Sequence, residues 1–167
     1  MSPSYYQISV PSFIRMLGNL STILDKAVAY AAERKIDESV LLQSRLFPDM
    51  YPLVKQVQIA TDQSKGSIGR LTGIAPPKFP DDETTFAQLQ ARIATTIGYL
   101  KGIPAEALDD TAAKQITLPW MPDRPLDGAP YLLHMAIPNV YFHVTTAYAI
   151  LRHNGVPLGK PDFIGEI

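Results

Sequence analysis

The segment from Gly128 to Leu151 contains no Asp, Glu, Lys or Arg, although 19% of the residues in the chain are charged. As a helix it is long enough to cross a bilayer, because about 20 apolar residues span the hydrocarbon layer. Its polar residues argue against that use, since His134, Asn139 and His143 would each need a partner in lipid. We therefore expect a buried helix of a soluble protein, with no membrane span.

The composition of the chain predicts a single domain over residues 1–167. A net charge of −1 gives no electrostatic reason to expect binding to nucleic acid or to an anionic membrane. The chain has no cysteine, which excludes disulfides, thiolate metal sites and a cysteine nucleophile. The first residues, MSPSYYQISVPSF, lack the pattern of a signal peptide, so we expect a cytoplasmic protein.

Apolar residues recur at spacings of three and four through most of the chain, which is the period of an amphipathic helix. Asp49 is expected to cap the second helix, Thr85 and Gln88 match a capping box for the third, and Gly73 and Gly102 supply stops. The predicted helices cover residues 10–34, 50–71, 86–101 and 130–153.

Residues 103–129 form a long excursion between the third and fourth helices, because they show no clear helical period. Residues 114–118 alternate polar and apolar side chains, which favours a short strand, and a hairpin is predicted through Met121 to Arg124. Helices with short connections favour an antiparallel four-helix bundle, so the predicted fold class is all-α with a short hairpin.

Polar side chains of the last helix gather at one edge of its apolar face. On a helical wheel centred on the row Leu133, Ile137, Val140 and Val144, His143 lies about 60° from the centre. Asn139 lies one turn earlier on the same edge, and Tyr148 lies on the opposite flank. His134 and His153 point outward on this wheel.

Two interpretations of His143 remain open. It is either a core-edge histidine hydrogen-bonded to a neighbouring helix, or part of a polar pocket between helices. Gln56 in the second helix, and secondarily Thr61, are the candidates to meet it. Asp62 falls opposite the apolar stripe, where it is expected to be solvated or paired with Lys65.

Two segments resemble a bacterial family of unknown function that is grouped with the DinB/YfiT-like four-helix bundles. They are PDMYPLVKQVQIATDQSKGSIGRLTG and IPNVYFHVTTAYAILRHNGVPLGKPDFIG, and the resemblance covers nearly the whole chain. It implies an up-down-down-up bundle that often forms homodimers. It also implies a metal site with one histidine from the second helix and an HxxxH pair from the fourth, and in some members thiol-dependent transferase or hydrolase activity.

The residues at the matching positions weaken the implied metal site. The fourth-helix pair falls on Asn139 and His143, and the second-helix position falls between Gln56 and Gln58, where the wheel favours Gln56. Zinc and nickel favour imidazole, thiolate or carboxylate over amide oxygen. We therefore expect no firmly bound metal and no cofactor.

The leading hypothesis is a small-molecule pocket lined by Gln56, Asn139, His143 and Tyr148 and covered by the 103–129 excursion. One alternative is a metal-assisted, thiol-dependent transferase or hydrolase of the DinB-like type, with His143 as ligand or base. Another is a non-catalytic, dimeric interaction module.

Overall fold

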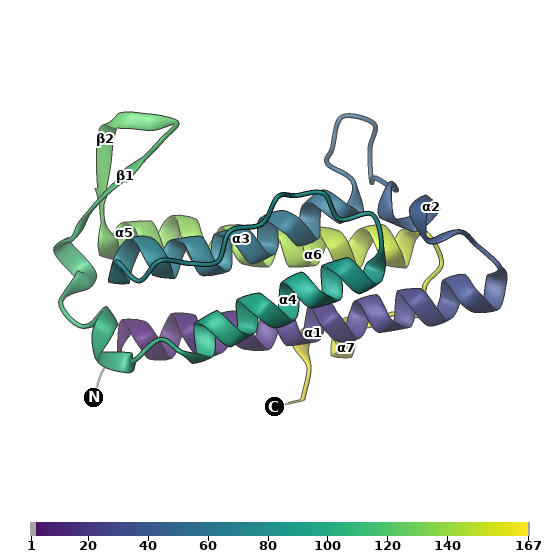
Figure 1. Cartoon of the computed structure of the whole chain (residues 1–167), viewed down its shortest axis with the longest axis horizontal. Coiled ribbons are helices and arrows are strands. Elements are labelled where there is room, and N and C mark those ends of the chain that lie inside the picture. The colour runs from purple at the N-terminus through teal and green to yellow at the C-terminus, as the bar shows by residue number, and fades with distance from the viewer. Residues whose placement is uncertain (1–2, 167) are drawn as a thin grey trace.

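Four long helices form the body of the protein in a computed structural model that describes residues 3–166. Around the bundle the order is α1, α4, α3, α6, so that each helix packs against two neighbours. Figure 1 shows α3 and α6 in one layer and α1 and α4 in the other. The four helices are α1 (Tyr5–Arg34), α3 (Leu53–Thr72), α4 (Phe86–Lys101) and α6 (Ile137–His153).

The chain direction gives the up-down-down-up arrangement that the resemblance implies (Figure 1). Residues 73–85 run back along α3 as an extended loop, and α4 therefore starts at the same end of the bundle as α3. The pairs α1–α4 and α3–α6 are antiparallel, whereas α3 and α4 are parallel. The all-α prediction, with one small two-stranded sheet, is confirmed.

Shorter elements connect and cover the long helices. Strand β1 (Gln115–Leu118) pairs antiparallel with β2 (Met121–Asp127). The turn of this hairpin lies at Pro119 and Trp120, so the predicted turn over Met121 to Arg124 is placed three residues too late. The others are α2 (Glu38–Leu42), η1 (Ala105–Leu108), η2 (Thr111–Ala113), α5 (Gly128–Tyr131) and α7 (Lys160–Ile164).

Local capping decides where the long helices begin. The capping box of Thr85 and Gln88 is confirmed at the start of α4. Helix α1 starts earlier than predicted, because Ser4 accepts a hydrogen bond from Gln7 N–H and forms a capping box there. The expected cap at Asp49 is wrong, since α3 begins at Leu53, whose N–H instead bonds the backbone oxygen of Ser44.

A π-helical turn, η3 (Leu132–Ala136), joins α5 to α6. In an α-helix Pro138 would lack the N–H that bonds the carbonyl of His134, four residues earlier, and its ring would clash with that carbonyl. The wider π-helical turn avoids the clash and removes the need for that hydrogen bond. The wider turn also rotates the residues before it. As a result Leu132 is 1% exposed and Leu133 is 41% exposed, so the predicted place of Leu133 in the apolar face is wrong.

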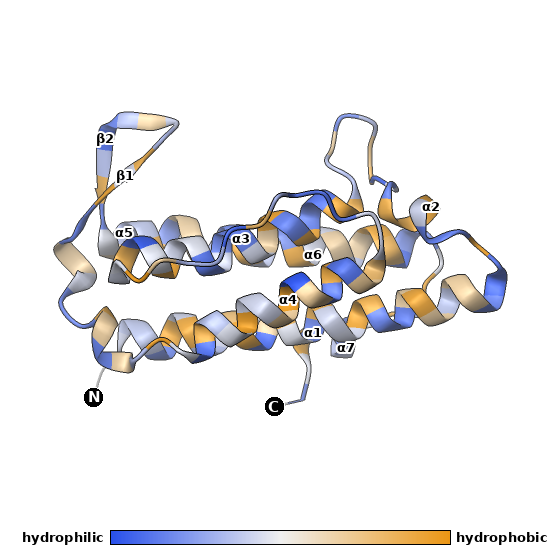
Figure 2. Cartoon of the chain, viewed as in Figure 1, coloured by the Kyte–Doolittle hydropathy of each residue, from blue (hydrophilic) through white to orange (hydrophobic). Residues whose placement is uncertain are grey.

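The core lies between the four long helices. Figure 2 shows hydrophobic stretches alternating with hydrophilic ones along each of them. The predicted stripe of α1, from Phe13 to Ala31, is buried throughout. No helix within residues 3–166 is both long enough and apolar enough to cross a membrane.

Candidate functional site

The imidazole of His143 is held by the side chain of Gln56. Its Nδ1 lies 2.7 Å from Gln56 Oε1, across the seam between α6 and α3. Gln56 is only 2% exposed and donates through Nε2 to the backbone oxygen of Tyr51 at 3.0 Å. This second bond turns Oε1 toward the ring, and an amide oxygen can only accept. Nδ1 therefore carries the hydrogen.

The other ring nitrogen, Nε2, is left with the lone pair of the neutral imidazole. No residue in the described range bonds Nε2. Every buried side-chain nitrogen or oxygen in that range has a partner, so Nε2 must be open to solvent. Burial lowers the pKa of His143 below its ordinary value, which keeps the ring neutral near pH 7. The arrangement offers a fixed, neutral hydrogen-bond acceptor and base.

An open pocket of about 550 Å³ lies on the surface of α6, and His143 is one of the residues that line it. Asn139 lies one turn before His143 and shares the pocket lining with it. Its amide has no hydrogen-bond partner among residues 3–166 and can both donate and accept. The remaining lining is uncharged, from His134, Met135, Pro138 and Phe142.

The structure brings together three of the four residues predicted from the sequence. Gln56 is hydrogen-bonded to His143 but does not line the pocket, whereas Asn139 and His143 both line it. Tyr148 lies elsewhere, because its ring packs on Phe163 of α7 at 6.4 Å between centroids. The predicted cover is also absent from the described lining, which contains no residue of the 103–129 excursion.

The wheel did not select Met135, Pro138 and Phe142 as site residues. They belong to two adjacent rows at a spacing of four, 134-138-142 and 135-139-143. The second row contains the predicted pair, so its extension by one turn would have found Met135. His134 is exposed as predicted, yet it lines the pocket because the pocket opens on the outer side of the helix.

The donors at this site do not match the metal centre implied by the resemblance. Residues 3–166 contain no group of three or more His, Cys, Asp or Glu side chains that could hold a metal. Gln56 Oε1, which occupies the expected second-helix position, is already engaged by Nδ1 of His143. The residues present therefore do not fit a histidine-rich zinc or nickel site.

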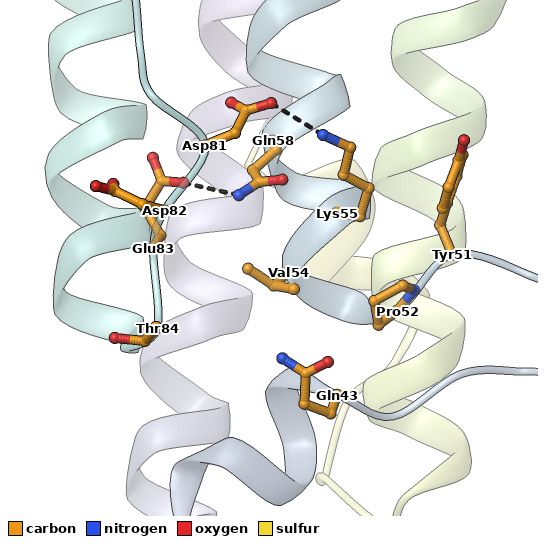
Figure 3. Close-up of a pocket in the computed structure, with 10 residues that line it drawn as sticks. All are labelled: Gln43, Tyr51, Pro52, Val54, Lys55, Gln58, Asp81, Asp82, Glu83 and Thr84. Atoms are coloured by element: carbon orange, nitrogen blue, oxygen red, sulfur yellow. Dashed lines mark hydrogen bonds and ion pairs between the residues drawn. The ribbon is translucent and has the colours of Figure 1, made fainter.

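A second hollow, of about 430 Å³, lies on the other edge of α3 between its first turns and the 73–85 loop. Figure 3 shows two bonds crossing it, from Lys55 to Asp81 and from Gln58 to Glu83. Their lengths are 2.9 and 2.8 Å. Since these polar groups already satisfy one another, the hollow is better explained as the place where the loop is fastened than as a binding site.

The buried side chain of Arg92 in α4 also holds the 73–85 loop in place. Its side chain is 1% exposed and forms ion pairs with Asp62 at 2.8 Å, Asp81 at 2.6 Å and Glu83 at 2.9 Å. We call these four residues the Arg92 clamp. Asp62 also pairs with Lys65 at 2.8 Å, as the sequence predicted.

The clamp depends on ionised carboxylates. Burial opposes the charge of Glu83, yet hydrogen bonds from Arg92 and Gln58 hold its pKa below the ordinary value. A lowered carboxyl pKa contributes stability above the unfolded value of about 4.3, and that stability is lost as the pH falls through the folded pKa.

Comparison with known proteins agrees with this fold. A family model described as a domain of unknown function (DUF1993) matches residues 5–164. The chain is also similar to a DinB family member protein from Shewanella denitrificans, whose crystal structure gives a TM-score of 0.93. The two are 46% identical, and the match covers 97% of this chain and 92% of that chain. No curated protein matches.

Proposed function

The chain belongs to the DUF1993 family and has the DinB-like helical fold, and on this basis we propose that it binds a small uncharged molecule at the His143 pocket without a firmly held metal. One observation carries the proposal. His143 Nδ1 is fixed by Gln56 while Nε2 has no partner among residues 3–166, and His143 shares the lining of one pocket with Asn139. Bundles build ligand sites from facing side chains of this kind.

The chemistry of the lining restricts the ligand. No charged side chain lines the pocket, and Met135, Pro138 and Phe142 supply apolar walls. A matching molecule has an apolar body and a polar end that donates a hydrogen bond to His143 Nε2. Its acceptor group would meet the amide of Asn139. A strongly charged ligand would find no counter-ion there.

The same open nitrogen supports a second candidate function. A neutral imidazole with a free lone pair can take a proton from a nucleophile, which is the role of base that the transferase or hydrolase alternative gives to His143. In that case the bond to Gln56 would orient the ring without the charge stabilisation that a carboxylate gives.

A thermal-shift screen with Zn²⁺, Ni²⁺, small thiols and uncharged metabolites tests both functions. A ligand at 100 times its dissociation constant stabilises the folded state by about 2.7 kcal/mol. For a chain of this length that raises the melting temperature by roughly 5–10 °C. The matched variants are His143→Ala and His153→Ala, since His153 is an exposed histidine of the same helix outside the pocket.

The proposed binding requires a hit that stabilises wild type and His153→Ala but not His143→Ala. A hit confined to the small thiols would favour the second candidate. The proposal fails if no compound raises the melting temperature, or if every hit acts equally on His143→Ala.

A further inference from the structure

Two neighbouring rows of side chains on α6 line the His143 pocket at different depths. Pro138 and Phe142 form an outer row and are exposed, Phe142 by 57%. Asn139 and His143 form an inner row, one residue further along the chain, and both are half-buried. All four belong to the regular part of α6, so their arrangement follows from helical geometry. The pocket therefore has an apolar outer side and a polar inner side.

The ring of Phe142 lies next to both polar residues of the inner row. Phe142 follows Asn139 by three residues, and residues three or four apart on a helix have Cβ atoms about 5–6 Å from each other. The same separation applies to Asn139 and His143, which are four residues apart. The rings of Phe142 and His143 have their centroids 5.2 Å apart. A molecule that contacts the Phe142 ring is therefore within reach of both polar side chains.

The planes of these two rings are perpendicular, at 88° to each other. A flat ring that stacks on Phe142 lies parallel to it and so crosses the plane of the imidazole. A hydrogen bond to His143 Nε2 fixes the direction in which the donor N–H points, but it leaves the donor ring free to turn about that bond. Stacking on Phe142 and donation to Nε2 are therefore compatible in one ligand.

We propose that the ligand of the His143 pocket is a flat, neutral heterocycle, such as a free purine base, with a ring N–H close to a ring nitrogen that accepts. This inference rests on the proposed function and names the class of molecule that is bound there. The ring N–H donates to His143 Nε2, the accepting nitrogen bonds the amide of Asn139, and the face of the ring stacks on Phe142. Phe142 then determines the specificity for a flat ligand.

Other classes of ligand leave part of this lining unused. A saturated apolar molecule contacts Pro138 and Phe142 but gains nothing from stacking. An aromatic hydrocarbon shields His143 Nε2 and the Asn139 amide from water without bonding either, and each polar group left unpaired in this way costs free energy. A charged ring finds no counter-ion, because no charged side chain lines the pocket. A neutral ring that donates and accepts along one edge satisfies all of these groups at once.

Isothermal titration calorimetry with benzimidazole and 1-methylbenzimidazole tests the ligand class on wild type alone. Benzimidazole has a ring N–H and an accepting ring nitrogen, and the second compound carries a methyl group in place of the hydrogen. At about pH 8 both compounds and His143 are neutral. The methyl compound should bind at least about 10-fold more weakly, because it leaves Nε2 without a donor. Equal affinities would overturn the proposal, as would the absence of benzimidazole binding up to millimolar concentration.

Substitutions of Phe142 test the stacking by itself. Phe142→Leu keeps an apolar side chain but removes the ring, and it should weaken benzimidazole binding by about 5- to 100-fold, as loss of base stacking on an aromatic side chain does. Phe142→Tyr keeps a ring and should bind as wild type does. Tyr141→Leu is the matched control, because Tyr141 is an exposed aromatic residue of the same helix that does not line the pocket. Unchanged affinity in Phe142→Leu, or an equal loss in Tyr141→Leu, would overturn the proposal.

Failure of the ligand class and failure of the proposed function give different results. If benzimidazole does not bind while another uncharged compound stabilises wild type but not His143→Ala, the ligand class is wrong and the proposed function stands. If benzimidazole binds wild type and His143→Ala equally well, both are wrong, since both require a bond to His143 Nε2. Binding that His143→Ala abolishes and Phe142→Leu weakens supports both.

Discussion

Replacing Arg92 with Met should loosen the Arg92 clamp that holds the 73–85 loop against α3. Arg92 Nε donates to Thr61 Oγ1 at 2.7 Å, and a terminal nitrogen donates to the backbone oxygen of Gln58 at 3.2 Å. The same side chain meets the three carboxylates of the clamp. Met retains much of the aliphatic volume, so the perturbation removes the charge and its hydrogen bonds rather than opening a large cavity.

The exposures of the three carboxylates set the size of the effect. The side chains of Asp62 and Asp81 are 37% and 32% exposed and keep lysine partners, so each accounts for at most about 1 kcal/mol. Glu83 is 8% exposed and keeps only Gln58. Removing one partner of a buried pair costs about 3–5 kcal/mol. We expect a total loss of about 3–7 kcal/mol, or roughly 6–28 °C in melting temperature.

Urea unfolding followed by circular dichroism at pH 7 measures this loss. Arg34→Met is the matched control, because Arg34 is exposed and makes no ion pair with another described residue. Adding Glu83→Gln to Arg92→Met should restore part of the stability, since it removes the unpaired buried charge. A loss below about 1 kcal/mol, or no recovery in the double variant, would refute the reasoning.

Three further predictions follow from particular contacts. Leu132→Ala should cost about 2–5 kcal/mol and Leu133→Ala less than about 1 kcal/mol, because only the first side chain is buried; equal losses in denaturant would contradict the π-turn. Gly128→Ala should cost about 3 kcal/mol or more, since a methyl group would overlap the backbone oxygen of Thr111, and an unchanged melting temperature would count against this packing. Between pH 7 and pH 5 wild type should lose more stability than His143→Gln. Below about pH 6.5 the unfolded chain binds a proton at His143, whereas the folded protein, in which the pKa of His143 is lowered, does not yet bind it. Parallel profiles of stability against pH for the two proteins would argue against this reasoning.

Sequence patterns within a single segment predicted the local structure of that segment well. The apolar stripe of α1, the capping box at Thr85 and the stop at Gly73 depend on neighbours within one or two turns, and all three are present. The wheel failed at Leu133 because it assumed 100° per residue through a segment where Pro138 forces a wider turn. The prediction of a cap at Asp49 is wrong because the N–H of Leu53 bonds the backbone oxygen of Ser44, a contact that no local capping pattern indicates.

The sequence by itself determined that one helix is free of charge and that Asn139 and His143 share one edge of it, since helical periodicity fixes which residues lie together on a helix. Only the tertiary structure decided what that edge can do. The proton on Nδ1 of His143 depends on Gln56, 87 residues away, whose orientation in turn depends on the Tyr51 carbonyl. Tyr148, on the opposite flank of the same helix, packs against Phe163 instead. Contacts between segments follow from how the helices pack, which no local pattern records.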